Sequence, residues 1–319
     1  MTLTMMTRAT KKRKTRTNNV QRGGRLVLPP RSLERRGSPI RKRKRKDTPM
    51  LVLAVVLLFA GALAFLLPVL MTDMEITQDA ADYSALRRQI ADANSPMLTP
   101  VTDDFVRLNS WQAPDASQAP AAAPVSEQRE VNVDLAACKA ANVDFIAWLQ
   151  IPNTTVDYPV VWSDDTDYYL HHTFVGKKSY IGTLFSLKKT DFQAPSRNIA
   201  IYGHHIRSND KVMFSPLLAY KEQSFYADHD TIYLDTLYHV GVYKVFAVLN
   251  MHNGDWEPST ADFTNVEDFL GFADRAKAQA LYDTGVEVQA SDQILTLITC
   301  DRSYGGKDGR LIVMAVKQK

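Results

Sequence analysis

The chain has 319 residues, of which 45% are hydrophobic and 23% charged, a balance that excludes a fully disordered or fibrous protein. Its net charge of +3 conceals an asymmetry: residues 1–49 contain 17 Lys or Arg against two acidic residues, so the other 270 residues carry a net charge of −12. The only cysteines are Cys138 and Cys300. This number excludes a disulfide framework or a Cys-rich zinc site and allows at most one bridge.

An apolar segment without any charge runs from residue 50 to residue 71. As a helix it would be about 33 Å long, which matches the hydrocarbon core of a bilayer. A cleaved signal peptide is the alternative, but its apolar region is usually about 7 to 15 residues long and follows a short basic start. Here 49 residues come first. The sequence therefore predicts a single N-terminal transmembrane helix over 50–71.

The charges that flank this segment predict its orientation. A run of six basic residues at 41–46 precedes it, and Asp73 and Glu75 follow it. The positive-inside rule then predicts a single-pass protein of the cell membrane, with the N-terminus in the cytosol and everything after residue 72 outside. The basic runs at 11–16 and 41–46 could each pass for nucleic-acid patches. A topology anchor that contacts anionic membrane lipid explains both, so no nucleic-acid partner is expected.

Three further segments follow from composition. Residues 1–49 have no Phe, Trp or Tyr and little helical periodicity, which predicts a basic, disordered cytosolic tail. Residues 72–130 are polar and include a stretch rich in Pro and Ala at 113–124, which predicts an extracellular stalk or linker. A helix within 77–93 is compatible with its residues, although no strong apolar face is present. From residue 131 to 319 short apolar runs alternate with turn residues, which predicts a folded domain.

This domain is expected to be mostly β. A short helix is predicted at 133–141, and an amphipathic helix at 266–282 precedes the last two strands. Between and after them lie eight runs typical of strands, and so many strands in fewer than about 190 residues predict a barrel or a sandwich. The predicted strands are 145–151, 154–162, 181–187, 198–204, 230–237, 239–252, 292–300 and 309–318.

Three residues at the ends of predicted strands could perform chemistry together. Cys300 ends one strand beside a loop, where a nucleophile is commonly found, although a buried structural cysteine is the alternative. His204 also follows a strand, and Gly203 before it permits close backbone approach. Arg310 begins the strand after the Cys300 loop, so a hairpin would bring its guanidinium towards the thiol, where it could stabilise an oxyanion.

Metal binding is not expected. The adjacent histidines at 171–172 and 204–205 would point to opposite faces of a strand, so neither pair is a convincing bidentate site. The acidic cluster Asp164, Asp165 and Asp167 invites a calcium hypothesis. It lacks the Gly and the distal Glu of the EF-hand spacing, which favours a solvated turn.

The sequence TLITC at 296–300, with the Gly-His at 203–204 and the strand-opening Arg310, resembles the signature of the sortases. These are membrane-anchored cysteine transpeptidases of Gram-positive bacteria. The segments 148–185 and 201–214 resemble class B sortases in particular, and the likeness covers about residues 131–319. It implies a closed eight-stranded β-barrel with an N-terminal helix and a helix before the last two strands. Residues 131–319 would then be the catalytic domain.

The resemblance also implies roles for individual residues. Cys300 would be the nucleophile, His204 the general acid and base, and Arg310 an oxyanion stabiliser or a substrate-positioning group. No cofactor is required. Ile298 departs from the small polar residue that class B relatives commonly carry two positions before the cysteine, which bears on substrate preference. The residues implied to line the peptide groove are Tyr202, Thr166, Leu170, Ile298 and Asp301.

The implied reaction cleaves a C-terminal, NPxT-like sorting motif of secreted proteins after Thr, through a thioester on Cys300. The product is then transferred to an amine of a lipid-linked peptidoglycan precursor. A pilin-polymerising sortase is an alternative. The same residues also suit a membrane-anchored cysteine peptidase, in which water resolves the thioester. In a third alternative, a non-enzymatic wall-facing scaffold, Cys300 would be part of the core.

Overall fold

The computed structural model describes residues 48–91 and 133–319. The chain divides into two compact units, residues 1–56 and residues 57–319, and everything below concerns the second unit, apart from the first turns of one helix. All but the last two residues of the predicted tail at 1–49, and most of the predicted stalk at 72–130, lie outside the described residues.

Helix α1 (Thr48–Ala91) contains the predicted apolar segment and continues well beyond it. Within the described residues it is the one helix long and apolar enough to cross a membrane, by length and composition. Its last turns differ from the apolar part because one face is buried, at Ile76, Asp79, Tyr83 and Ile90. The spacing of these residues places them on one side of a helix. The stretch 77–93, which lacks a strong apolar face in the sequence, therefore still has a buried face, and that face is partly polar.

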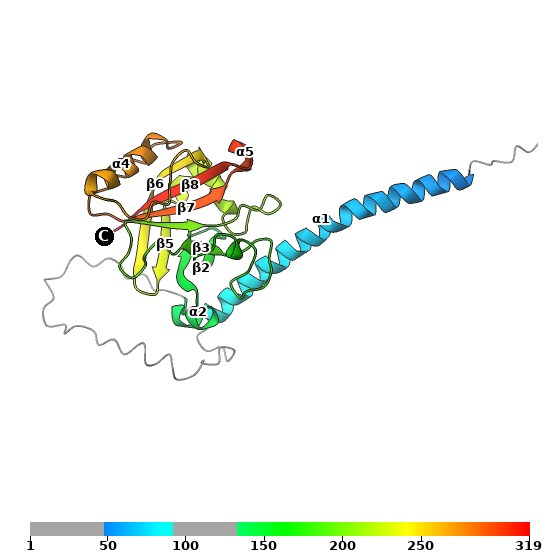
Figure 1. Ribbon diagram of the computed structural model, residues 1–319, viewed down its shortest axis with the longest axis horizontal. Helices are drawn as coiled ribbons and strands as arrows, with labels where there is room; N and C mark the ends of the chain where they lie inside the picture. The colour runs from blue at the N-terminus through cyan, green and yellow to red at the C-terminus, as the bar shows by residue number, and fades with distance from the viewer. Residues whose placement is uncertain (1–47, 92–132) are drawn as a thin grey trace, which may run out of the picture. The chain divides into compact units, whose positions relative to one another are not determined.

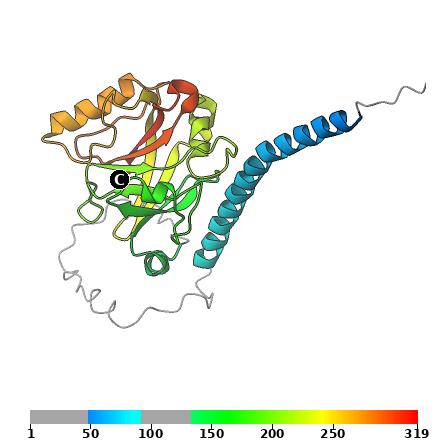
Figure 2. The same ribbon diagram turned by 45° about the vertical axis from the view of Figure 1, so that its right-hand side comes forward.

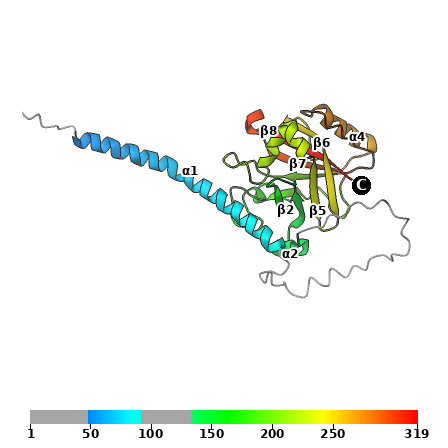
Figure 3. The same cartoon turned by 180° about the vertical axis from the view of Figure 1, so that it is seen from behind.

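The eight runs predicted as strands each contain one strand in the described domain, and together these form a closed barrel in the order β1-β2-β3-β4-β7-β8-β6-β5. The predicted mostly-β barrel is thereby confirmed. Figure 1 shows β7 and β8 side by side, and Figure 3 shows β5 and β6 adjacent on the reverse side. The strands are β1 (Phe145–Gln150), β2 (Asp157–Ser163), β3 (Leu184–Leu187), β4 (Asn198–Tyr202), β5 (Thr231–Thr236), β6 (Val240–His252), β7 (Ile294–Cys300) and β8 (Gly309–Lys317).

The barrel is not purely antiparallel. Strands β2 and β3 pair in parallel, and so do β4 and β7, whereas β7 and β8 are antiparallel. Parallel neighbours end at the same edge, so the last residues of β4 and β7 lie close together. Strand β8 runs the other way and begins at that edge. This topology brings Tyr202, Cys300 and Gly309 to one rim of the barrel.

Helix α4 (Val266–Ala278) covers part of the outer barrel wall beside β6, as Figures 1 and 2 show. The Asn265 side chain caps its first turn. Phe269 and Phe272 are buried against the sheet, and burial of such a side chain stabilises by roughly 1.5–3 kcal/mol. The helix ends four residues before the predicted position 282, because the Leu281 N–H donates to the carbonyl of Val248 in β6 instead of continuing the helix.

The other helical elements are short. Helix α2 (Leu135–Ala141) is the predicted helix at the start of the domain, with Asp134 as its N-cap. The remaining four elements are only one or two turns long, and no periodic pattern in the sequence predicts them. They are η2 (Tyr168–Leu170), η3 (Ser215–Lys221), α3 (Gln223–Asp228) and α5 (Arg302–Gly305).

Candidate active site

The register of β4, β7 and β8 places the predicted site residues on one outer face of the barrel. Tyr202 pairs with Ile298, and Ile298 pairs in turn with Ile312. Two residues further along, Cys300 is paired with Arg310. Because side chains alternate along a strand, Ile298 and Cys300 point to the same face of β7. The predicted hairpin between the Cys300 and Arg310 strands is therefore present, with the two residues directly opposite one another.

Gly203, the residue that follows β4, lies where the surrounding residues leave no room for a side chain. A Cβ atom on Gly203 would lie 2.4 Å from Leu184 and 2.7 Å from Phe214, closer than carbon atoms approach. Two hydrogen bonds fix Gly203 to β7: the Gly203 N–H donates to the Ile298 carbonyl at 3.2 Å, and the Thr299 hydroxyl donates to the Gly203 carbonyl at 2.8 Å. His204 is therefore held at the same rim as Cys300.

His204 is half-buried, and its ring contacts the segment between β2 and β3. Its Nε2 lies 3.0 Å from the carbonyl oxygen of Leu170. A carbonyl oxygen can only accept, so Nε2 carries the proton and Nδ1 is the nitrogen that gains or loses one. Burial lowers the pKa of His204 below its ordinary value, and the charges of His171 and Arg302 act in the same direction. The imidazole is thus mostly neutral at neutral pH.

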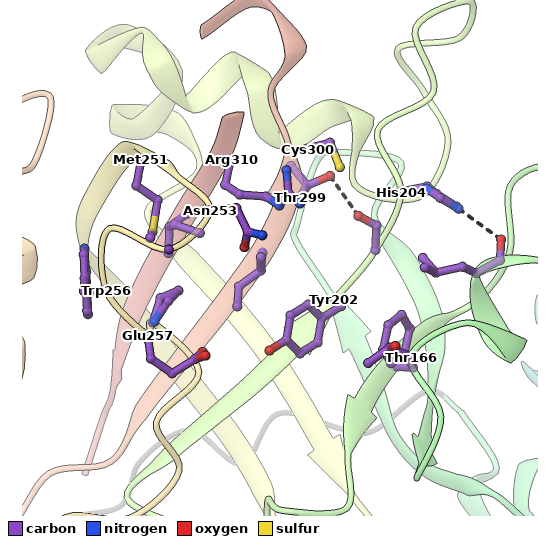
Figure 4. A pocket seen from close by; sticks show the side chains of 17 residues that line it. Thr166, Tyr202, His204, Met251, Asn253, Trp256, Glu257, Thr299, Cys300 and Arg310 are labelled. Atoms are coloured by element: carbon purple, nitrogen blue, oxygen red, sulfur yellow. Dashed lines mark hydrogen bonds between the residues drawn. The ribbon is translucent and has the colours of Figure 1, made fainter. Parts of the chain in front are cut away.

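Cys300 is the last residue of β7 and is partly exposed, with a free thiol. In Figure 4 its Sγ points to the side on which His204 lies. The other free cysteine, Cys138, is completely buried in α2, and burial raises its pKa to about 12. A thiol of that kind is inert, because the thiolate is the reactive form. Of the two cysteines, Cys300 is therefore the one suited to act as a nucleophile.

The guanidinium of Arg310 is fixed by its own loop. Its Nη1 donates to the carbonyls of Lys307 and Gly309, both at 3.0 Å. These bonds use one of the two terminal nitrogens, and the side chain still lines the cleft beside Cys300. A guanidinium held this way presents a fixed charge and fixed donors at the rim.

A cleft of about 580 Å³ joins these residues. Figure 4 shows it from close by. It contains the three predicted catalytic residues and four of the five predicted groove residues, although they come from four separate parts of the sequence. These seven are Cys300, His204, Arg310, Tyr202, Thr166, Leu170 and Ile298.

Asp301, the fifth predicted groove residue, lies outside the lining of the cleft. It is completely buried, and its carboxylate forms an ion pair with Lys221 of η3. The N–H and hydroxyl of Ser303 donate to its other oxygen. Burial by itself raises the pKa of this carboxyl, but the bonds from Lys221 and Ser303 outweigh burial and leave the pKa below its ordinary value. Asp301 therefore fixes the start of α5 directly after Cys300.

His205 contacts the backbone of Cys300 and is absent from the lining of the cleft. Its Nδ1 lies 3.1 Å from the Cys300 carbonyl and donates to it, since that oxygen can only accept. Burial lowers the pKa of His205.

The end of β6 and its connection to α4 form the far wall of the cleft, and none of the residues predicted for the site lies there. Trp256 is fixed there by a hydrogen bond from its Nε1 to Gln279 and by an edge-to-face contact with Phe272. A signal was present, because HNGDWEP at 252–258 opens a long connection, and such loops are often functional. The residues of this wall are Met251, Asn253, Gly254, Trp256, Glu257 and Pro258.

Throughout the described parts of the chain, no group of three or more His, Cys, Asp or Glu side chains is arranged to hold a metal ion. In the acidic cluster, Asp164 pairs with Lys188 and the Asp165 carboxylate accepts from the Asp167 N–H. These carboxylates support a turn between β2 and η2.

Comparison with known proteins agrees with this geometry. A family model for the sortase domain matches residues 149–318. The sortase B of Listeria monocytogenes is 31% identical over 195 residues, which cover 60% of this chain and 77% of the relative. The sortase B of Staphylococcus aureus is 29% identical over 188 residues, covering 59% and 76%.

Solved structures give the same result. The Staphylococcus aureus sortase B–substrate complex superposes with a TM-score of 0.54 at 28% identity, covering 58% of this chain and 84% of that one. The sortase B of Bacillus anthracis in complex with AAEK1 gives a TM-score of 0.53 at 31% identity, covering 61% and 89%.

A closed barrel with a cysteine, a histidine and an arginine at one rim is the architecture of a cysteine transpeptidase. The family model matches more than half of the length of this chain, and the chain therefore belongs to the sortase family. Within that family its relatives and structural neighbours are class B sortases. Sortases act on proteins that carry sorting signals and on cell-wall precursors, and the apolar part of α1 is consistent with a membrane anchor.

Proposed function

We propose that this sortase cleaves an NPxT-like motif of secreted proteins after its Thr and transfers the product to an amine of a lipid-linked peptidoglycan precursor. The observation that carries the proposal is the pairing of Cys300 with Arg310 across β7 and β8, beside His204 at the end of β4. One cleft thus holds a nucleophile, a proton carrier and a fixed cation, which acyl transfer requires.

In the first step, the Cys300 thiol gives its proton to Nδ1 of His204, and the resulting thiolate attacks the carbonyl carbon of Thr in the motif. The C–N bond breaks as the S–C bond forms, and His204 gives its Nδ1 proton to the departing amine. Because Nε2 stays bonded to the Leu170 carbonyl, the ring keeps its orientation during the transfer. Arg310 stabilises the negative charge that develops on the carbonyl oxygen.

In the second step, the acceptor amine attacks the thioester carbon. The new amide forms, the S–C bond breaks, and the neutral imidazole of His204 takes the proton that the amine loses. The low pKa of His204 favours this base function, because the ring is mostly neutral before the amine arrives. Water can replace the amine, in which case the product is a free acid.

The cleft supports a peptide-sized substrate. Tyr202, Ile298 and Leu170 offer apolar surface next to the reacting groups, and Thr166 lies at the same wall. Ile298 stands where class B relatives commonly have a small polar residue, so we propose that this chain favours a more apolar or smaller group at the neighbouring motif position. Asp301 acts on the substrate through the position of Cys300.

The location follows from charge and hydropathy. We propose that α1 anchors the protein in the cell membrane, in contact with membrane lipid, with the basic residues 41–46 on the cytosolic side and the barrel outside. The acceptor is then at the same membrane surface as the enzyme.

The test uses the full chain in detergent micelles, a peptide that contains Asn-Pro-Gln-Thr-Gly, and triglycine as the amine. Mass spectrometry detects the thioester on Cys300 and the product. Ligated product supports the transpeptidase, and product that is hydrolysed at every amine concentration would indicate the peptidase. Cys138→Ala is the matched control and should still form the thioester. Absence of a thioester with every NPxT-like peptide, despite rapid alkylation of Cys300, would overturn the proposed substrate class.

A further inference from the structure

The last turns of α1 contact the segment that joins β2 to β3, here called the β2–β3 connection (residues 164–183). Within the described domain, the contact face comprises Ile76, Asp79, Tyr83 and Ile90, each no more than 6% exposed. Arg87 adds an ion pair to Asp157 at 2.7 Å. This part of α1 thus belongs to the folded domain, although it directly continues the apolar segment.

The Tyr83 hydroxyl is the central polar contact. The N–H of Phe174 donates to it at 2.9 Å, and it donates to the Gly182 carbonyl at 2.8 Å. The Thr183 hydroxyl oxygen also lies 2.8 Å away. A single hydroxyl therefore joins two parts of the β2–β3 connection that are eight residues apart in sequence. Its donor and acceptor capacity is used within a buried site, where an unmade bond is costly.

Asp79 fixes the same segment one helical turn earlier. Its carboxylate accepts from the Ser179 hydroxyl at 2.6 Å and pairs with Lys177 at 3.2 Å. The Ser179 oxygen in turn accepts from the N–H groups of Ile181 and Gly182. The backbone at 179–182 is thus held from α1 by side chains at two levels.

This held backbone supports the catalytic histidine. Gly182 has a φ of +64°, and a Cβ there would lie 2.5 Å from the Tyr169 carbonyl and 2.7 Å from the Leu170 carbonyl. The Thr183 N–H donates to the Tyr169 carbonyl at 2.8 Å. The Leu170 carbonyl is the acceptor for Nε2 of His204. From Tyr83 to the imidazole, each element is therefore in direct contact with the next.

We propose that Tyr83 is a positioning residue: the extramembrane end of α1 orders the β2–β3 connection and thereby holds His204 and the Leu170 wall of the cleft. This role rests on the proposed function of His204. In this proposal, α1 both anchors the enzyme in the membrane and positions a residue of its active site.

The test compares Tyr83→Phe with Tyr243→Phe in the full chain in detergent micelles. Tyr243 is an equally buried tyrosine whose hydroxyl donates to Gln293 at 2.9 Å. Gln293 directly precedes β7, at the opposite end of that strand from Cys300. Each variant loses one buried hydroxyl and keeps the ring, so Tyr243→Phe controls for a general loss of stability.

Two readouts separate positioning from stability. NMR of ¹³C-labelled histidines, assigned with His204→Gln, follows the titration of the imidazole. We expect Tyr83→Phe to move the midpoint of His204 upwards, towards its ordinary value, because burial is the largest influence on this pKa and a loosened connection admits water. Displacement of His171, which lies in the connection and also lowers the pKa, acts in the same direction, whereas loss of the Leu170 bond acts against it and is the smaller effect. Single-turnover acylation at saturating peptide should fall about tenfold. Tyr243→Phe should change neither.

The proposal is overturned if the His204 midpoint and the acylation rate of Tyr83→Phe match those of Tyr243→Phe. The NMR readout needs no substrate. If the wild-type chain acylates with none of the peptides, the proposed substrate fails, while the His204 titration still decides whether Tyr83 positions the ring.

Discussion

Cys300 and Arg310 are directly opposite each other on the antiparallel strands β7 and β8. Opposed side chains in such a pair have Cβ atoms about 5 Å apart on one face of the sheet. The short helix α5 interrupts the connection between these strands, and Asp301 caps it. The spacing between the Cys300 thiol and the Arg310 guanidinium thus depends on backbone pairing, and this spacing leads to several predictions.

Replacement of Cys300 by Ala should abolish thioester formation and leave folding intact. The side chain is partly exposed at the rim, so its loss leaves little cavity. Mass spectrometry of the enzyme with a sorting peptide checks the thioester, and thermal unfolding checks the fold. Turnover above about a thousandth of the wild-type rate would argue against Cys300 as the nucleophile.

His204→Ala should lower the acylation rate about 100- to 10,000-fold, the usual contribution of general acid–base catalysis. His205→Ala is the matched neighbour. It loses a hydrogen bond to the Cys300 carbonyl and should lower the rate only about tenfold or less, the effect of one neutral hydrogen bond. Single-turnover acylation measures both. A larger loss in His205→Ala than in His204→Ala would exchange their proposed roles.

Arg310→Lys should remain strongly impaired in acylation, because it keeps the charge and loses the planar fork of donors. Arg310→Ala should be only modestly worse, with a total loss of about 100- to 1,000-fold. The measurement is single-turnover acylation, so that resolution by the amine does not mask the step. Near-wild-type acylation by the Lys variant would show that a diffuse positive charge suffices.

The folded chain should lose stability as the pH falls below the ordinary pKa of histidine, 6.5. Burial lowers the pKa of His204, so the unfolded chain binds this proton at a higher pH than the folded chain. Stability therefore rises with pH from the lowered pKa up to 6.5. Urea unfolding at about pH 5.5 and about pH 7.5 should show a smaller difference for His204→Gln than for the wild type. An equal difference between the two pH values in both proteins would contradict a lowered pKa of His204 in the folded chain.

Lys221→Met should destabilise the domain by roughly 2–4 kcal/mol, because it leaves the buried Asp301 carboxylate without its cation. The matched variant Lys211→Met removes an exposed lysine, for which changes within about 0.5 kcal/mol are typical. Urea unfolding gives both values. Acylation should fall along with stability in Lys221→Met, since Asp301 fixes the backbone next to Cys300. An unchanged free energy of unfolding in Lys221→Met would mean that the ion pair does not stabilise the backbone next to Cys300.

Much of this protein was determined by the sequence itself. An apolar run of 22 residues predicts a span, and alternating apolar runs between turn residues predict strands, because both depend on local hydrophobic pattern. Cys300, His204 and Arg310 could be chosen because each stands at the edge of such a run. That these three residues lie close together was also predicted, from the hairpin between the Cys300 and Arg310 strands and from the position of Cys300 and His204 at the ends of their strands.

Other features were decided only by the tertiary structure. Asp301 is adjacent to Cys300 in sequence, yet its burial depends on Lys221, 80 residues earlier, and no local pattern encodes that contact. The wall around Trp256 forms only once α4 packs against β6. The buried face of α1 includes Asp79 and Tyr83. Because these residues are polar, a search for apolar residues at helical spacing does not detect this face. Polar groups become buried when distant partners satisfy them, and the fold alone brings those partners together.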